Sequence, residues 1–516
     1  MTVEFAIGGA DAATAALMAG RSALIWHRFI ADTITPVGAA VRFLVEGRGD
    51  FLLESVEGGE TRGRYSLLGL DPDLIFRAQG GRAEVNRCWQ TDRAAFERAD
   101  GDPLRALRRL HAACRFDVPG ELPPVLASLV GYLGFGAAAL VEKVERSAAD
   151  PLGLPDMLFV RSTVLIVFDQ LKDEAFCVAP LWADGPAAPA QAETIIAEVR
   201  NRIAAIMDQF GTAASGLASA SEPVVRSRQA PSTAKPRPAV PAASYKGLVQ
   251  RAQEYIAAGD IFQVVLAQRF TAPFTLPPMA LYRALRRVNP SPFLYLLDLP
   301  GFALVGSSPE ILVRVRGGEV TVRPIAGTRP RGATPAADRA AEAELLADPK
   351  ERAEHLMLLD LGRNDVGRVA QGGSVRVASS FAVERYSHVM HIVSEVTGRL
   401  AAGHDALDAV LAGFPAGTVS GAPKVRACQI IGELEPEARG PYAGAVGYFA
   451  PDGSVDSCIV LRTAVLKDDV MHVTAGAGIV ADSDPLAEQR ECEAKAGALF
   501  AAAHEAMALA NGETAE

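Results

Sequence analysis

Short runs of apolar residues, separated by glycine or acidic turns, recur along most of this 516-residue chain. RSALIWHRFI (21–30) and RSTVLIVFDQ (161–170) are examples in the first half, and PFLYLLDL (292–299) is one in the second. Such runs are typical of β-strands, and VRGGEV (315–320) is typical of a hairpin turn. Because strands neighbour strands and helical segments are segregated, the pattern predicts an α+β fold with antiparallel sheets.

A compositional break divides the chain into two parts. Residues 211–243 are rich in Ala, Ser and Pro and contain almost no large apolar residue. Such a stretch cannot bury enough surface to offset the entropy lost on ordering. The sequence therefore predicts an N-terminal region (1–210), a flexible linker (211–243) and a C-terminal domain (244–516), with the N-terminal strands packing back on the sheets of the C-terminal domain.

The overall charge and the cysteines limit the classes of partner and the compartment. Asp and Glu number 61 against 51 Lys and Arg, so the net charge of −10 argues against a duplex nucleic acid or an anionic membrane as partner. The six cysteines are scattered without a CxxC pair, the N-terminus lacks the basic region of a secretory signal, and no uninterrupted apolar run is long enough to span a membrane. We therefore expect a cytoplasmic protein.

Glu354 lies beside the apolar middle of a helical segment. The segment 348–369 (DPKERAEHLMLLDLGRNDVGRV) is apolar most of the way round its middle, which predicts a buried helix. A carboxylate there, at Glu354, needs a cation or stays protonated. The cation is either the Arg or Lys of an ion pair or a metal ion.

The C-terminal helical segment 485–507 carries a polar line made by Glu488, Glu491 and Lys495. One interpretation is a solvated Glu–Lys stripe. The other is that Glu491 faces Glu354 across a cleft, where two carboxylates would suit Mg²⁺.

Two glycine-rich segments and one strand have features of ligand sites. FPAGTVSGAPKVRACQII (414–431) predicts a helix with Pro423 in its first position, and free backbone N–H groups at such a start attract anions. VMHVTAGAGIVADSDP (470–485) has two glycines that permit close approach to the backbone. Both patterns are also typical of ordinary tight turns. In YSHVMHIVSEV (386–396), His388 or His391 is either a general base or a structural strand residue.

Taken together, a series of ordered segments resembles the chorismate-utilising enzymes over about Tyr245 to Phe500. Among them are GDIFQVVLAQRF, RPIAGTRPRG, AEHLMLLDLGRNDVGRV, FPAGTVSGAPKVRA and EQRECEAKA. FLLESVEGGETRGRYSLLG (51–69) is similar to the tryptophan-binding segment of the anthranilate synthase branch of that family, although LLES alone is also typical of a plain edge strand. The resemblance implies large, mostly antiparallel sheets packed together with helices outside.

The resemblance also implies a set of site residues. It implies that Glu354 and Glu491 hold a Mg²⁺ ion on the ring carboxylate of chorismate, that Glu310 protonates the departing hydroxyl, and that His391 is the base of the second step. The implied substrate contacts are Thr418, also counted as catalytic, and Gly327, Thr328, Tyr442, Arg462, Gly476, Ala477, Gly478 and Lys495. The implied tryptophan-inhibitor contacts are Leu53, Glu54, Ser55, Pro290, Ser291 and Pro292.

Two positions distinguish the activities within the family. Relatives that add water resemble this chain but have Lys at the position of Gln263, and relatives that aminate C4 have Lys at the position of Ala326. The resemblance therefore implies amination at C2 by a Mg²⁺-dependent lyase, which forms anthranilate and pyruvate, the first step of tryptophan biosynthesis, under feedback inhibition by tryptophan.

The ammonia source and the competing activities complete the expectation. No segment matches a glutamine amidotransferase, so we expect a separate amidotransferase subunit in a hetero-oligomer. The alternatives are aminodeoxychorismate synthase component I, an aminase that stops before pyruvate loss, and a catalytically inactive chorismate-binding regulatory subunit. The presence of Glu310, Glu354, His391 and Glu491 together argues against the last.

Overall fold

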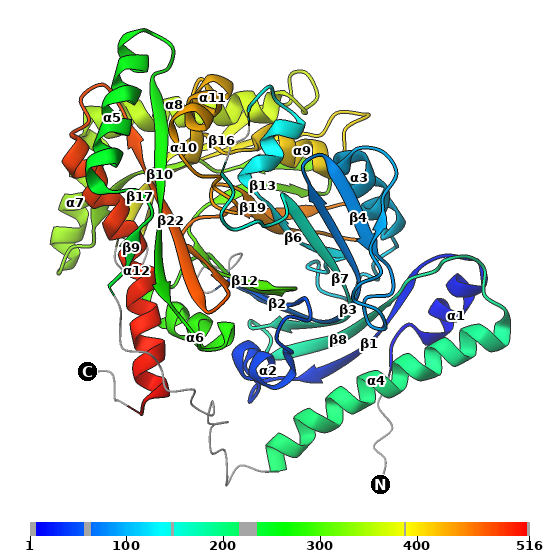
Figure 1. The fold of residues 1–516 in the computed structure, drawn as a ribbon. Coiled ribbons are helices and arrows are strands. Elements are labelled where there is room, and N and C mark those ends of the chain that lie inside the picture. The colour runs from blue at the N-terminus through cyan, green and yellow to red at the C-terminus, as the bar shows by residue number, and fades with distance from the viewer. Residues whose placement is uncertain (1–6, 56–62, 146–148, 216–234, 386–388, 513–516) are drawn as a thin grey trace.

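The computed structural model describes residues 7–55, 63–145, 149–215, 235–385 and 389–512 (Figure 1). Its helices are α1 (Ala10–Met18), α2 (Pro36–Phe43), α3 (Pro103–Ala113), α4 (Pro189–Ser215), α5 (Ala242–Ala257), α6 (Pro278–Val288), α7 (Pro335–Ala347), α8 (Pro349–Gly367), α9 (Ala406–Gly413), α10 (Gly417–Ser420), α11 (Lys424–Leu434) and α12 (Pro485–Ala510), with a 3-10 helix at Phe135–Leu140.

The strands before α5 are β1 (Ala23–Ile30), β2 (Asp50–Glu54), β3 (Tyr65–Gln79), β4 (Arg82–Asn86), β5 (Glu97–Arg98), β6 (Leu129–Leu133), β7 (Met157–Asp169), β8 (Glu174–Leu181) and β9 (Arg237–Pro238). Those after it are β10 (Gln263–Pro273), β11 (Phe293–Leu299), β12 (Phe302–Ser308), β13 (Ile311–Arg316), β14 (Glu319–Val322), β15 (Ile325–Pro330), β16 (Arg376–Arg385), β17 (Val389–Arg399), β18 (Gly421–Ala422), β19 (Ala445–Phe449), β20 (Val455–Ile459), β21 (Thr463–Lys467) and β22 (Val470–Ile479).

The strands form one continuous hydrogen-bonded network, and every pairing between the described strands is antiparallel. β2 pairs with β11, and β6 pairs with β19, so strands from the two halves of the chain are joined in the same sheet. The predicted α+β class and the packing of N-terminal strands on the sheets of the C-terminal domain are confirmed.

Helices cover the outside of the sheets (Figure 1). α12 packs against β22, α5 and α6, and α1 and α4 cover β1 and β8. The apolar side chains between these layers form the main buried clusters, because each amphipathic helix must bury its apolar face against a sheet. Among the described helices, none combines the length and apolarity needed to cross a membrane.

The ends of the predicted linker are ordered. α4 continues to Ser215, β9 pairs with β10, and α5 begins at Ala242, so the limits 211–243 are too wide at both ends. Small residues such as Ala permit a helix to continue, and the β9 pairing uses backbone groups, which need no apolar side chain. Residues 216–234 lie outside the described residues, and the linker there stays a prediction.

α8 is buried on one side only. His355, Leu358 and Leu359 are buried against β15 and β17, but Leu356 is 57% exposed. The prediction of a buried helix is confirmed for one face only, because a helix on one face of a sheet buries a stripe, and this segment has more apolar residues than the stripe can hold.

Candidate active site

A cavity of about 270 Å³ lies between β10, β15, β22 and the helices α8, α10 and α12. The predicted site residues that line it are Glu310, Gly327, Thr328, Glu354, Thr418, Tyr442, Arg462, Gly476, Gly478 and Lys495. These residues come from distant parts of the chain, so their convergence is a property of the fold. Apolar side chains such as Val265 and Leu358 complete the walls and reduce access of water.

Glu310, between β12 and β13, is the most strongly perturbed acid of the cavity. Burial raises its pKa to about 8, against the opposing effect of hydrogen bonds from Thr418 and from the backbone N–H of Ile325. The Thr418 hydroxyl donates to Oε1 over 3.1 Å. At neutral pH the carboxyl group is therefore protonated, so it can act as a proton donor inside the cavity.

His391 lies on β17 directly opposite Thr328 of β15. Its Nδ1 is 3.1 Å from the Gly327 carbonyl and 3.0 Å from the Thr328 hydroxyl. Burial lowers its pKa, and the charge of Arg462 lowers it further, so the ring is neutral near pH 7. Because the Gly327 carbonyl can only accept, we assign the proton to Nδ1, and Nε2 is then the nitrogen that accepts a proton.

The opposite wall is made by the backbone of β22. A Cβ at Gly476 would lie 2.8 Å from the Tyr442 hydroxyl, and one at Gly478 would lie 2.6 Å from Nε2 of Gln263. Glycine is required at 476, where a Cβ would also lie 2.9 Å from the backbone carbonyl oxygen of Leu266, whereas at 478 the flexible Gln263 side chain would have to move. Lys495, on α12, donates from Nζ to the Gly476 carbonyl over 2.9 Å, which fixes a cation at the edge of the cavity.

Glu354 lies close enough to Glu491 for the charge of Glu491 to act on it. Burial raises the pKa of Glu354, Glu351 and Glu491 raise it further, and Lys350 and a hydrogen bond with Gln263 oppose the rise. Glu354 forms no ion pair with Lys or Arg among the described residues. Lys350 is paired instead with Asp482, at 3.5 Å. The ion-pair interpretation of Glu354 is therefore not supported.

Glu491 has the Glu–Lys pairing expected of a solvated stripe. Its side chain is 47% exposed, and its Oε1 lies 2.6 Å from Nζ of Lys495. It is not among the residues that line the cavity.

The donor set fits a hard divalent cation. Two carboxylates that repel each other would be stabilised by a shared cation, and oxygen ligands are those that Mg²⁺ prefers. In the described ranges no group of three or more His, Cys, Asp or Glu residues forms a complete protein cage. Mg²⁺ suits such a partial site, because it keeps several waters and uses substrate oxygens as ligands.

Ala477 and His391 are not in the wall of this cavity. Ala477 is fully buried in the hydrophobic core, because its side chain points to the other face of β22 from the two glycines. His391 lines a neighbouring cavity of about 400 Å³, which also contains Arg462 and Lys495. The two cavities therefore meet at Pro309, Arg462 and Lys495.

The residues expected to contact tryptophan fall into two groups. Pro290, Ser291 and Pro292 line the neighbouring cavity. Leu53 and Glu54 lie at the end of β2, where Glu54 pairs with Leu294, and Ser55 follows half-buried. LLES is therefore not an edge strand, because β2 is paired on both sides, with β11 and with β3.

Glu54 is the charged side chain among Leu53, Glu54 and Ser55. It is 4% exposed, and its Oε2 accepts from the Tyr282 hydroxyl at 2.5 Å and from Arg286 at 3.1 Å. The other oxygen has no hydrogen-bond partner among the described residues.

The glycine-rich segment 414–431 is organised slightly differently from the prediction. α11 begins at Lys424, and Pro423 is its extended N-cap residue rather than its first helical residue. The short helix α10 precedes it and carries Thr418 into the cavity. Lys424 is buried in an ion pair with Asp365, at 2.8 Å, so this helix start already has an internal charge partner. His388 lies outside the described residues.

The hydrogen bond between Gln263 and Glu354 was not predicted. Sequence reasoning identified Gln263 only by its contrast with lysine in relatives. The signal that was available is a buried polar residue at the start of the apolar run IFQVVL, which in this structure is 8% exposed and lines the cavity.

Comparison with known proteins identifies the family. The family model described as chorismate binding enzyme matches residues 50–501. The chain belongs to the chorismate binding enzymes. The predicted resemblance is confirmed, and the cavity residues from Glu310 to Lys495 all lie within the matched segment.

Relatives of high coverage share one name. Anthranilate synthase component 1 from Cereibacter sphaeroides is 52% identical over 496 residues, which cover 95% of this chain and 96% of that protein. The protein of the same name from Thermus thermophilus is 45% identical, and the match covers 93% of this chain and 97% of that protein.

Solved structures agree with the fold. Anthranilate synthase component I from Streptococcus pneumoniae has a TM-score of 0.72 and 33% identity, with 92% of this chain and 99% of that chain covered. The menaquinone-specific isochorismate synthase from Escherichia coli has a TM-score of 0.67 at 19% identity, with 93% and 94% covered, and shows that the chorismate binding fold is shared.

Proposed function

We propose that this chain is component 1 of an anthranilate synthase, a lyase that converts chorismate and ammonia into anthranilate, pyruvate and water. The observation that carries the proposal is the composition of the cavity, which gathers Glu310, Glu354 and Arg462 and has Gln263 and Ala326 in its wall. Neither an amide nor a methyl group can serve as the base for water or as a nucleophile at C4. The names of the relatives point to the same reaction.

The first chemical step needs a proton donor, because hydroxide is a poor leaving group. In our mechanism Glu310, neutral because burial raises its pKa to about 8, gives its proton to the C4 hydroxyl. Ammonia forms its bond to C2 as water leaves C4 and the ring double bonds shift. Thr418 orients the Glu310 carboxyl through its hydrogen bond to Oε1.

The second step restores aromaticity. The Nε2 atom of His391 takes the proton from C2 of the substrate. The C3–O bond then breaks, and the departing enolpyruvate gains a proton to become pyruvate. The hydrogen bond from His391 Nδ1 to the Gly327 carbonyl fixes the orientation and the tautomer of the imidazole ring. Arg462 borders both cavities, where its planar guanidinium suits the enolpyruvyl carboxylate.

Glu354 and Glu491 are the residues that would hold Mg²⁺. The ion would supply charge stabilisation to the ring carboxylate of the substrate. Gln263 holds Glu354 in position from the neighbouring strand β10.

The direct test is product formation by the purified chain with chorismate, MgCl₂ and an ammonium salt. Fluorescent anthranilate and an equal amount of pyruvate are expected. An aminated product without pyruvate would indicate an aminase that stops before pyruvate is lost. A product aminated at C4, the precursor of p-aminobenzoate, would indicate aminodeoxychorismate synthase. Chorismate binding without turnover would indicate a regulatory subunit.

Gln263→Leu tests the positioning of Glu354. The substitution removes the amide that bonds to Glu354 but keeps a similar volume, so the carboxylate loses its orientation. Outer partners of metal ligands contribute about 10–100-fold to metal affinity or activity. We expect the Mg²⁺ concentration for half-maximal rate to rise by about that factor, with kcat at saturating Mg²⁺ reduced less. An unchanged Mg²⁺ titration would contradict this role.

We also propose that a separate glutamine amidotransferase subunit supplies ammonia and that tryptophan inhibits the enzyme. The name component 1 supports a partner component. The adjacency of the β2 end to β11, which follows Pro290–Pro292 in the chain, supports one inhibitor site made from both segments. A cytoplasmic location stays a prediction from the sequence.

Ser55→Phe tests the inhibitor site. Ser55 is half-buried at the end of β2, where a phenyl ring would fill space that we assign to tryptophan. We expect the concentration of tryptophan for half-inhibition to rise at least tenfold, with the uninhibited rate near that of the wild type. An inhibition curve identical to that of the wild type would remove Ser55 from the site.

A further inference from the structure

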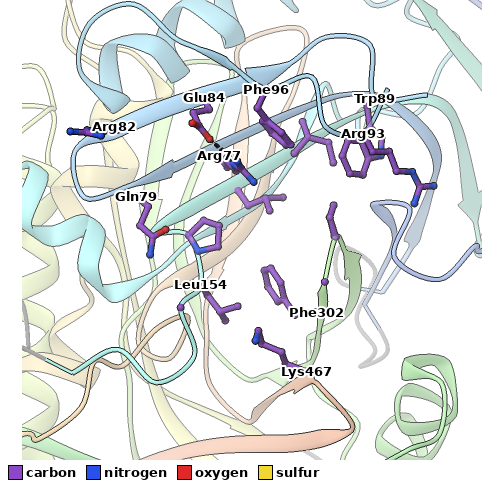
Figure 2. Close-up of a pocket in the computed structure, with 16 residues that line it drawn as sticks. Arg77, Gln79, Arg82, Glu84, Trp89, Arg93, Phe96, Leu154, Phe302 and Lys467 are labelled. Carbon is purple, nitrogen blue, oxygen red and sulfur yellow. Dashed lines mark hydrogen bonds and ion pairs between the residues drawn. The ribbon is translucent and has the colours of Figure 1, made fainter. Parts of the chain in front are cut away.

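A second large cavity, of about 590 Å³, lies away from the candidate active site (Figure 2). It is bounded by β3 and β4, the segment 89–96, residues 153–155 before β7, the turn at 300–302, and Lys467 at the end of β21. None of the predicted site residues lines it. Its volume is in the range of small-molecule sites, about 300–1,000 Å³.

The walls of this cavity provide flat apolar surfaces. Trp89 is 4% exposed and Phe302 is 7% exposed, so each presents only a small area to the cavity, whereas Phe96 is half-buried and offers the larger aromatic surface. The Trp89 Nε1 donates to the Arg48 carbonyl over 2.7 Å, and the ring contacts Phe96 edge-on at 6.2 Å between centroids. The aromatic surface is therefore held rigidly before any ligand arrives.

Cations outnumber acids around the cavity. Four lining residues are basic, and Glu84 is the one acid that lines it. The basic residues are Arg77, Arg82, Arg93 and Lys467. A locally positive site attracts anions, although the chain as a whole has a net charge of −10.

Some of these cations have local partners. Arg77 is paired with Glu84 at 2.7 Å and lies over the Phe96 ring at 3.8 Å, and Lys467 is paired with Asp468 at 2.7 Å. Arg93 contacts the Trp89 ring at 5.3 Å. Neutralising the two ion pairs still leaves the charges of Arg82 and Arg93 in excess.

Figure 2 shows how these groups are arranged. Arg77 and Phe96 lie on one side of the open space, and Leu154, Phe302 and Lys467 lie on the other. A flat molecule placed between the two sides would contact the stacked Arg77 and Phe96 side chains on one face, and apolar side chains and Lys467 on the other.

We propose that this cavity binds a planar aromatic carboxylate, with its ring between the aromatic walls and its carboxylate at Arg93 or Lys467. Aromatic stacking and a charge-assisted hydrogen bond each favour such a ligand over a neutral or an aliphatic one. A docked protein loop fits less well, because Trp89 and Phe302 are nearly covered and lie inside a concavity rather than on a flat exposed patch.

This cavity is separate from the candidate active site. β21 runs from Thr463, next to Arg462, to Lys467, and strands rise about 3.3 Å per residue, so the cavity lies roughly 15 Å from Arg462. Its ligand therefore does not contact chorismate, and binding can be measured without any turnover. The inference is independent of the proposed reaction.

The experiment is calorimetric titration of the full chain with 2-naphthoate and with neutral 2-naphthamide, each repeated with excess chorismate. We expect one 2-naphthoate per chain, at least tenfold tighter than the amide and unaffected by chorismate. Arg93→Gln and Lys467→Gln should each weaken the acid about tenfold and leave the amide unchanged. Arg251→Gln, at an exposed arginine of α5 paired with Glu254, is the matched control and should not change binding.

Several results would overturn the proposal. Equal affinity for acid and amide, or equal affinity in the variants and the wild type, would show that the cations do not recognise the carboxylate. Competition by chorismate would place the probe in the catalytic cavity. Failure of 2-naphthoate to bind, together with loss of amidotransferase assembly in Arg93→Gln, would show that the cavity is a protein interface. Melting temperatures near that of the wild type confirm that the variants are folded.

Discussion

Glu310→Gln should lower kcat by about 10²–10⁴-fold and should at the same time stabilise the protein at alkaline pH. The rate falls because the amide cannot donate the proton that the C4 hydroxyl needs, and general acids contribute about that factor. Glutamine has nearly the same shape, and Thr418 can still donate to its carbonyl oxygen. The measurement is the steady-state rate of anthranilate formation with saturating chorismate.

The gain in stability follows from the sign of the pKa shift. The folded pKa of Glu310 is raised to about 8 from an ordinary value of 4.5. Its contribution to stability is therefore fully present below the unfolded pKa and is lost as the pH rises through about 8. At pH 9 the wild type carries a buried charge that opposes folding by roughly 3–5 kcal/mol, and the amide does not.

We therefore expect Glu310→Gln to have a higher melting temperature than the wild type at pH 9 and a similar one at pH 5. At a fixed concentration of free NH₃, the wild-type rate should also decline above about pH 8, as the acid loses its proton. A variant with lower activity and lower stability at both pH values would instead indicate a structural role for this carboxyl group.

Glu354→Gln should abolish the dependence of turnover on Mg²⁺, with a loss of rate of at least about 100-fold. The amide is a weaker ligand and carries no charge to balance the cation. Because a ligand that binds only the folded state raises its stability, the wild type should gain melting temperature from MgCl₂ with chorismate, and the variant should not.

Asp360→Asn is the matched control on the same helix. Asp360 is exposed and paired with Arg363 at 3.1 Å, three residues along α8, and it does not line the cavity. Its replacement should change neither the rate nor the response to Mg²⁺. Normal activity in Glu354→Gln would remove this residue from the ligand set, and equal losses in both variants would indicate damage to α8 as a whole.

Local signals in the sequence predicted elements well where one period dominated. The alternating run at Val389–Arg399 is a strand, with Met390 and Ile392 buried and His391 on the other face. The pairing of His391 with Thr328 was not deducible, because register between distant strands depends on which faces are buried in the final sheet.

The site was predictable in composition but not in arrangement. Motifs identified Glu310, but the perturbation of its pKa arises from burial and from contacts with Thr418 and Ile325 that lie elsewhere in the sequence. The same limit explains the errors. One side of α8 is exposed because the neighbouring strands cover only part of the helix. The ends of the linker are ordered because they pair with strands or continue helices. A local sequence pattern contains neither kind of information.

The pairing of β2 with β11 has a consequence for synthesis of the chain. Leu53 leaves the ribosome about 240 residues before its partner Tyr295, which at ~5–20 residues per second is a wait of roughly 10–50 s. During that interval the nascent β2 presents an unpaired edge that invites pairing with other nascent chains. Successful production of this enzyme therefore depends on keeping the early strands of one nascent chain apart from those of other nascent chains until β11 has been translated.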